Sequence, residues 1–303
     1  MCADCGCSSE AKATVTDVKT GKVSEIWRDI AGRLHEGGYI HDRRAEHNRA
    51  HDHHHDHGDG HHHDHTHGHD HHHDHAHDHG HSHTHGVVGL EHAILAKNDA
   101  LAVQNRAWLA GREVLMLNLV SSPGSGKTTL LERTIRDMKD YVPITVIEGD
   151  QATTNDAKRI EAAGAGAVQV NTGTGCHLEA DMIKHGLDSL KPRPGSLVFV
   201  ENVGNLVCPA LFDLGEKAKV AILSVTEGED KPMKYPHMFR AARLLLLNKI
   251  DLLPHLDFSI EKAVVFAREV NPDVEIIQVS AKSGEGMTAW YQWIERQLAD
   301  VRL

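Results

Sequence analysis

Metal-ligating side chains are concentrated in the first 85 residues of the 303-residue sequence. The opening segment MCADCGC places Cys2, Cys5 and Cys7 close enough for a flexible chain to wrap one ion, although chance or redox exposure could also explain them. The stretch 51–85 holds 20 His and seven Asp residues, which cannot build a core. We interpret it as a tract that binds several Ni²⁺, Cu²⁺ or Zn²⁺ ions, with a purification tag or a solvated linker as the alternatives. Its densest ligand runs are His53, His54, His55, His61, His62, His63, His71, His72 and His73.

A third group of ligands comprises Cys176, its neighbour His177, and Cys208. Each segment follows a predicted strand, and the ends of parallel strands meet at one edge of a sheet. We therefore expect these three side chains at the same edge. Two thiolates and an imidazole suit Zn²⁺ or Ni²⁺ and leave the coordination shell incomplete, for a second subunit or water to fill. The alternative is that both cysteines are small buried apolar residues.

The segment SSPGSGKTT, residues 121–129, lies between an apolar run and a helical pattern. Glycines in such a loop let backbone N–H groups approach phosphate oxygens, while Lys127 supplies charge to the β- and γ-phosphates and Thr128 can bind Mg²⁺. Ser121 stands where the usual pattern has its first glycine, so the strict motif fails by one residue. We still predict a phosphate-binding loop, with contacts from Gly124, Ser125, Gly126, Lys127, Thr128 and Thr129.

Two later segments predict that the base is guanine. In NKID, residues 248–251, an Asn and an Asp at this spacing can read guanine, because the carboxylate accepts from the ring N–H and the exocyclic amine. In SAK, residues 280–282, the backbone can meet the guanine oxygen. In this order, each at the end of a strand, the segments are typical of P-loop GTP-binding proteins. The predicted contacts are Asn248, Lys249, Asp251, Ser280, Ala281 and Lys282.

Acidic residues at two further strand ends are candidates for Mg²⁺ binding and catalysis. Asp150 ends the segment EGD, and Glu201 resembles the acidic residue of a Walker B strand. The N–H of Gly204 could sense the γ-phosphate. We predict Lys127, Asp150 and Glu201 as catalytic residues, although either carboxylate could instead cap a helix or lie in a solvated loop. A Gln or Arg that would assist hydrolysis is not evident, so slow hydrolysis of GTP is expected.

The elements that position these residues follow a strand–helix alternation. Seven short apolar runs, at 114–120, 144–148, 167–171, 196–201, 219–225, 243–248 and 274–280, alternate with helical patterns. Such runs indicate a parallel sheet covered on both faces. Further helices are expected over 90–109, ending near Gly111, and at the C-terminus. The sequence thus predicts an α/β P-loop NTPase fold, mostly parallel and flanked by helices, preceded by a disordered His-rich region.

We divide the chain into a segment 1–50 with the Cys motif, a His-rich tract 51–86, and a GTPase domain 87–303. Residues 8–50 have few apolar residues and are expected to be disordered, with a short helix near 23–35 as the alternative. The net charge of −11 and the lack of a basic patch argue against nucleic acid as a partner. No apolar run is long enough for a membrane span, and the N-terminus lacks the apolar run of a signal peptide. An odd number of cysteines, five, suits metal binding in a reducing compartment better than disulfides. We therefore expect a cytoplasmic protein.

With these motifs in view, the chain resembles the HypB family of hydrogenase nickel-incorporation GTPases. The resemblance covers MCADCGC, SSPGSGKTT, EGDQAT, GTGCHLEA, ENVGNLVCPA, NKID and SAK. It implies a GTP-dependent nickel chaperone for [NiFe] hydrogenase that dimerises over GTP. It also implies a metal site of Cys176, His177 and Cys208 near the dimer interface, a tighter nickel site at the N-terminal cysteines, and nickel storage in the tract. The implied partners are the nickel chaperone HypA and the hydrogenase large subunit.

The sequence leaves three other functions open. A urease nickel-insertion GTPase can carry a His stretch, but that family places its ligands in a Cys-Pro-His triplet, whereas Cys208-Pro209 is followed by Ala210 here. A passive nickel-storage protein would not need the intact GTP motifs. A translation or signalling GTPase would leave the Cys and His segments unexplained.

Overall fold

A computed structural model describes residues 13–28, 34–36, 84–150, 155–173 and 175–302. Within these ranges, strands form one sheet in the order β10-β9-β8-β4-β7-β5-β6-β1-β2-β3. The strands are β1 (Ala13–Asp17), β2 (Val23–Arg28), β3 (Leu34–Glu36), β4 (Leu115–Ser121), β5 (Ile144–Asp150), β6 (Gly166–Asn171), β7 (Leu197–Glu201), β8 (Ala218–Ser224), β9 (Ala242–Asn248) and β10 (Glu275–Val279). The helices are α1 (Thr84–Ala110), α2 (Lys127–Met138), α3 (Asn155–Ala163), α4 (Ala180–Leu190), α5 (Cys208–Leu211), α6 (Lys231–Lys234), α7 (Pro236–Ala241), α8 (Ile260–Val270) and α9 (Met287–Val301), with a 3-10 helix at Ile250–His255.

The seven strands from β4 to β10 are those that the apolar runs predict, and their mutual pairings are all parallel. The prediction of a mostly parallel α/β fold is therefore confirmed. Strand β4 lies in the middle, between β7 and β8, and every residue from Leu115 to Ser121 is buried. Because the strands run in the same direction, the loops after β4, β5, β7 and β9 all open at one edge of the sheet.

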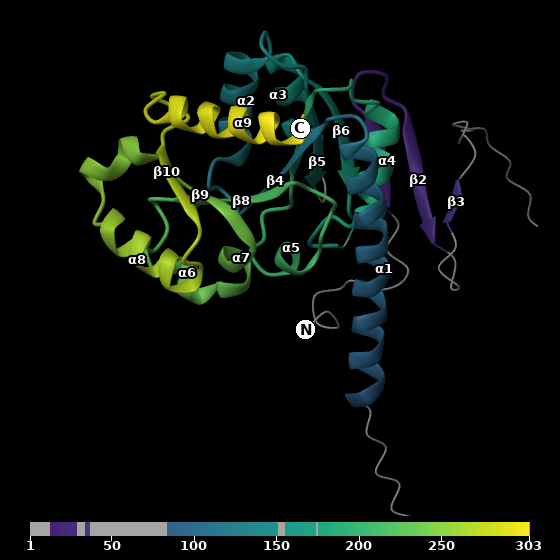
Figure 1. Cartoon of the computed structure of the whole chain (residues 1–303), viewed down its shortest axis with the longest axis horizontal. Coiled ribbons are helices and arrows are strands. Elements are labelled where there is room, and N and C mark those ends of the chain that lie inside the picture. Colours follow the sequence, from purple (N-terminus) through teal and green to yellow (C-terminus); the bar gives the residue numbers. More distant parts are fainter. Residues whose placement is uncertain (1–12, 29–33, 37–83, 151–154, 174, 303) are drawn as a thin grey trace, which may run out of the picture.

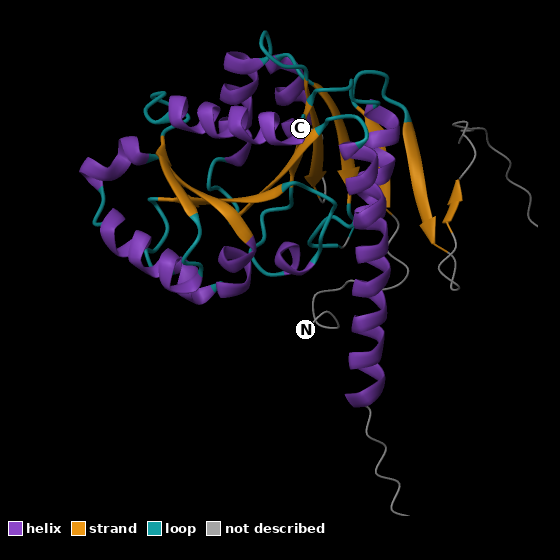
Figure 2. Ribbon diagram, viewed as in Figure 1, coloured by secondary structure: helices purple, strands orange, loops and turns teal. Residues whose placement is uncertain are grey.

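Helices cover both faces of the sheet (Figures 1 and 2). On one face, Leu115, Leu117 and Leu119 of β4 pack in a cluster with apolar residues of α2, α3 and α9. On the other face, Met116 joins a cluster that includes Leu109 of α1 and Leu187 of α4. The alternation of side chains along a strand explains why one apolar run serves two cores. A third cluster, under α7 and α8, covers β8 and β9.

Residues 13–28 correct one prediction. They form a hairpin, in which β1 pairs antiparallel with both β2 and β6 and so extends the sheet. Ala13, Val15 and Ile26 are buried against the α1–α4 side of the core. The expectation of disorder, or of a helix near 23–35, is therefore wrong for Ala13–Arg28. Three apolar side chains are buried, and β1 pairs with the backbone of β6, which would otherwise be a free edge of the sheet.

The expectation of disorder is also wrong for Leu34–Glu36, which form β3 and pair antiparallel with β2, and for residues 84–86, where α1 begins. The remaining N-terminal predictions concern residues outside the described ranges, including Cys2, Cys5, Cys7 and the histidines of the tract up to residue 83. The boundaries at residues 50 and 86 remain predictions. The helix expected over 90–109 begins at Thr84, and its N-terminal part extends away from the sheet (Figure 1). Among the described helices, none combines the length and the apolar character that a membrane crossing requires.

Candidate nucleotide pocket and metal-ligating cluster

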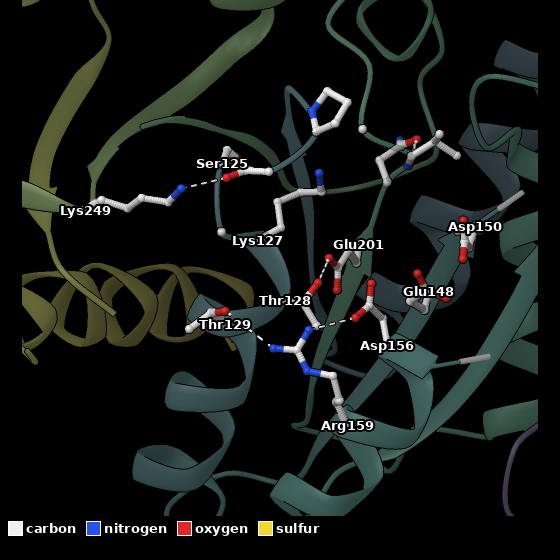
Figure 3. A pocket seen from close by; sticks show the side chains of 17 residues that line it. Ser125, Lys127, Thr128, Thr129, Glu148, Asp150, Asp156, Arg159, Glu201 and Lys249 are labelled. Carbon is white, nitrogen blue, oxygen red and sulfur yellow. Dashed lines mark hydrogen bonds and ion pairs between the residues drawn. The ribbon is translucent and has the colours of Figure 1, made fainter. Parts of the chain in front are cut away.

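A cavity of about 580 Å³ lies at the edge of the sheet where these loops open (Figure 3). Its walls come from the loop 123–129, from the ends of β5 and β7, from α3 and from Lys249. Of the predicted nucleotide-site residues, Gly124, Ser125, Gly126, Lys127, Thr128, Thr129, Asp150, Glu201, Gly204 and Lys249 line it. The structure thus brings together segments that are more than 100 residues apart in the sequence.

The phosphate loop is held in shape by its own side chains. The Lys127 ammonium donates to the Ser121 hydroxyl at 2.7 Å, and that hydroxyl also accepts from Ser125 at 2.5 Å. Ser121 therefore has a definite role at the position where the usual motif has glycine. Burial lowers the pKa of Lys127, while the nearby carboxylates of Glu201 and Glu148 oppose that shift. Lys127 is positioned for a phosphate that would replace Ser121 as its partner.

The NKID segment braces the same loop. The Asn248 amide donates to the carbonyl of Ser125 at 2.9 Å, and Lys249 donates to the carbonyl of Gly124 at 2.7 Å. A Cβ at Gly126, whose φ is +98°, would lie 2.7 Å from the Asn248 amide nitrogen, so the glycine permits this approach.

The SAK segment contacts the carboxylate of Asp251 in the NKID segment. The Ser280 hydroxyl donates to Asp251 at 2.6 Å, which links the ends of β9 and β10 where the base is expected. Ala281 is buried beside Ser280, and Lys282 is exposed.

Two buried carboxylates face each other across the pocket floor. Glu148 and Glu201 are direct partners in the pairing of β5 with β7, and they are 3% and 4% exposed. Thr128 donates to Glu201 at 2.7 Å. Burial raises the pKa of Glu148 to about 9, with further raising from Glu201 and Asp150, and burial raises the pKa of Glu201 to about 7.

Glu148 is a candidate that the sequence reasoning missed, although an acidic residue within the apolar run ITVIE was a usable signal. The predicted Asp150 lines the same pocket two residues further on. One carboxylate oxygen each of Glu148 and Glu201 is buried without a hydrogen-bond partner. Together with the Thr128 hydroxyl, which donates to the other oxygen of Glu201, these orphaned oxygens form a donor set that suits a hard cation such as Mg²⁺.

The three predicted metal ligands of the folded domain converge beside this pocket. The ligand atoms of Cys176, His177 and Cys208 all lie within 4.8 Å of one another. The two sulfurs are 2.8 Å apart as free thiols, and His177 Nδ1 lies 3.7 Å from the sulfur of Cys176. The imidazole is 4% exposed and its ring centroid lies 3.9 Å from that of Phe212. The cluster can offer two sulfurs and one nitrogen to a soft or borderline cation.

Comparison with known proteins identifies the family. A model of the CobW/HypB/UreG nucleotide-binding domain matches residues 115–278, which contain the phosphate loop, the NKID segment and the Cys/His/Cys cluster. The hydrogenase maturation factor HypB of Escherichia coli K12 is 63% identical over 208 residues, which are 69% of this chain and 72% of that protein. The chain belongs to the HypB family. The resemblance predicted from the motifs is thereby confirmed, together with a nucleotide-binding domain.

Other HypB proteins extend the comparison. The hydrogenase/urease maturation factor HypB of Helicobacter hepaticus is 40% identical over 210 residues, 68% of this chain and 86% of that protein. The crystal structure of Helicobacter pylori HypB in complex with nickel superposes with a TM-score of 0.64 at 35% identity, and covers 67% of this chain and 96% of that one. The HypB assignment thus holds in both sequence and fold.

Proposed function

We propose that this chain is a GTP-hydrolysing nickel metallochaperone, which stores nickel and delivers it during maturation of [NiFe] hydrogenase. The observation that carries the proposal is that the nucleotide pocket and the Cys/His/Cys cluster are joined by direct contacts. The nickel-bound HypB of Helicobacter pylori supports nickel as the cargo. The Cys176, His177 and Cys208 set would hold one ion, with Zn²⁺ as a possible competitor.

The contacts between the two sites run through three residues. Leu178, which follows His177, donates its backbone N–H to the side chain of Asn202 at 3.4 Å, and Asn202 lines the nucleotide pocket next to Glu201. Asn205 donates to the carbonyl of Cys176 at 3.3 Å. A movement of the loop after β7 on nucleotide binding would therefore displace the backbone of two metal ligands.

The chain's own groups can bind and polarise GTP. Backbone N–H groups of Ser125 and Gly126 and the Lys127 ammonium would cradle the phosphates, and Asp251 would select guanine. Thr128, Glu201 and Glu148 would hold Mg²⁺, which supplies charge neutralisation on the β- and γ-phosphates when bound. Burial of the pocket floor keeps water away from these charges. We expect slow hydrolysis, so the nucleotide state would act as a switch rather than as an energy source.

Partners follow from the same proposal. The incomplete donor set of the cluster would be completed by a second copy of the chain, in a homodimer that forms on GTP binding. HypA and the hydrogenase large subunit are proposed as receivers of the metal. The His-rich tract, and the Cys2, Cys5 and Cys7 motif, would serve as a nickel reservoir and a separate nickel site.

Equilibrium dialysis against a competing chelator tests the proposal. Nickel binding would be measured at about pH 7.5, where imidazoles are neutral, with GDP and with a non-hydrolysable GTP analogue. The full chain would be compared with a variant that lacks 51–83 and carries Ser at Cys2, Cys5 and Cys7. This variant keeps residues 13–28, because the hairpin completes the sheet.

The expected result is that the variant retains about one ion per chain, with an affinity that differs between the two nucleotides. Adding Cys208→Ala to this variant should abolish both the ion and the difference. If the affinity for the remaining ion is the same with GDP and with the GTP analogue, or if Cys208→Ala leaves that affinity unchanged, passive storage is the better description. Purified protein that shows no GTP turnover would contradict the enzymatic part.

The Helicobacter hepaticus relative is a hydrogenase/urease maturation factor, so urease is a second candidate for the enzyme that receives the nickel. Deletion of the gene separates the two. Loss of [NiFe] hydrogenase activity with unchanged urease activity would support hydrogenase as the client, and the reverse would favour the urease function.

A further inference from the structure

Arg159 is an arginine in the nucleotide pocket that the proposed function does not use. It lies in α3 and lines the cavity beside the phosphate loop, and it is the only arginine among the described lining residues. Its Nη2 lies 3.5 Å from the hydroxyl of Thr129, the loop residue that follows Thr128 (Figure 3). The guanidinium therefore lies beside the loop whose backbone N–H groups are expected to cradle the α- and β-phosphates of a bound nucleotide.

Two carboxylates hold the guanidinium in its present place. Glu132 accepts from Nε at 3.1 Å and from Nη2 at 3.0 Å, and Asp156 accepts from Nη1 at 2.8 Å. Arg159 is 44% exposed, and ion pairs at this exposure contribute little to stability because water and salt screen them. A phosphate carries more charge than a carboxylate and matches the planar fork of arginine, so it can compete for Arg159.

A purely structural role for Arg159 is the alternative, and Arg136 provides a control for it. Arg159 joins α3 to Glu132 of α2 and could serve only to fasten these two helices. Arg136 also pairs with Glu132, at 3.4 Å, and is 55% exposed, but it does not line the pocket. If fastening were the whole role, removal of Arg159 would affect stability and leave nucleotide binding alone. Because the pair of Arg136 with Glu132 lies within α2, Arg136→Ala controls for the loss of a charge partner of Glu132 without touching the pocket.

We propose that Arg159 is a phosphate-binding residue that exchanges Glu132 for the α- and β-phosphates when a guanine nucleotide binds. The inference rests on the proposed GTP binding and adds a phosphate-contacting residue that the sequence motifs did not identify. Glu132 then competes with the nucleotide for the same guanidinium. Because GDP and GTP share these phosphates, Arg159 contributes equally to the affinity of both.

The test measures Kd for GDP and for a non-hydrolysable GTP analogue, with Mg²⁺, in the full-length protein. Arg159→Ala should raise both Kd values by about tenfold or more, and by similar factors, since a charge-assisted contact is lost. Arg159→Lys should fall between wild type and Ala because it keeps the charge and loses the fork. Arg136→Ala should match wild type in both Kd values.

Glu132→Gln provides a readout of opposite sign. Removing the competing charge should lower both Kd values, by about two- to fivefold, whereas a fastening role would never tighten nucleotide binding. Unchanged Kd values in Arg159→Ala would overturn the inference, and a lowered melting temperature in that variant alone would then assign Arg159 to fastening α3 to α2. A fall in kcat with unchanged Kd values would also overturn it, because the contact would then belong to the γ-phosphate during reaction. Wild-type protein that binds neither nucleotide would contradict the proposed function instead.

Discussion

The side chain of Leu178 packs directly on the backbone of Gly149. A Cβ at Gly149 would lie 2.8 Å from both Cγ and Cδ1 of Leu178. Gly149 separates the pocket residues Glu148 and Asp150, and Leu178 follows the proposed metal ligand His177. The nucleotide pocket and the metal cluster therefore share a van der Waals contact as well as the hydrogen bond between Leu178 and Asn202.

Gly149→Ala should disturb metal binding through this contact. The added methyl group must displace Leu178, and with it His177, at an expected cost of about 1–3 kcal/mol in folding free energy. In the variant that lacks 51–83 and the N-terminal cysteines, we expect nickel affinity to fall and its dependence on nucleotide to shrink, measured by dialysis with GDP and a GTP analogue. The matched control is Gly166→Ala in neighbouring β6, whose Cβ would meet only ordinary contacts at 3.8 and 3.9 Å. Equal nickel affinities in both variants would refute the linkage.

Gly126→Ala should weaken nucleotide binding by more than tenfold. Its φ of +98° is strained for alanine, and the new Cβ would lie 2.7 Å from the Asn248 amide, so the loop and the NKID segment must separate. Titration with a fluorescent GDP analogue measures the effect. Gly21→Ala is the control, because its φ is +68° but nothing lies within 4 Å of the added Cβ. It should lose about 1 kcal/mol of stability and keep its affinity for GDP.

The facing carboxylates predict how stability depends on pH in the absence of nucleotide and metal. Burial raises the pKa of Glu148 from 4.5 to about 9, so the folded protein binds more protons than the unfolded chain between these values. Stability is then greatest at the acidic end of this range and falls as pH rises through it. Thermal unfolding in chelator should show a lower melting temperature at about pH 8.5 than at about pH 6.

Glu148→Gln isolates this effect from other titrating groups, because the amide stays neutral throughout. The difference in melting temperature between the two pH values should be smaller in the variant than in wild type. An equal difference in both proteins would show that Glu148 is ionised in the folded state.

The hairpin of residues 13–28 should contribute to global stability. Val15 is 2% exposed and pairs with Val170 of β6, whereas Val23 in the adjacent strand is 58% exposed. Val15→Ala should cost about 2 kcal/mol in the free energy of unfolding, measured by denaturant titration, and Val23→Ala should cost about 0.5 kcal/mol or less. If Val15→Ala were as mild as Val23→Ala, the hairpin would not belong to the cooperative unit.

The sequence by itself determined the parallel sheet and placed the candidate site residues at its edge. Continuous apolar runs can bury only as central strands, and the residues that follow them must emerge where the strands end. The positions of Lys127, Asn248 and the Cys176–His177 pair relative to the sheet follow from this local rule. Residue type then indicated phosphate, guanine and metal as ligands.

Tertiary structure decided which of those strand ends became neighbours. The order of β4, β7 and β5 sets Glu148 opposite Glu201, and the packing of α3 on α2 places Arg159 beside Thr129. The docking of residues 13–28 depends on a free edge at β6, and the contact between Gly149 and Leu178 depends on two loops meeting. These features arise from pairings between segments distant in the chain, and local apolar patterns carry no information about which segments will pair.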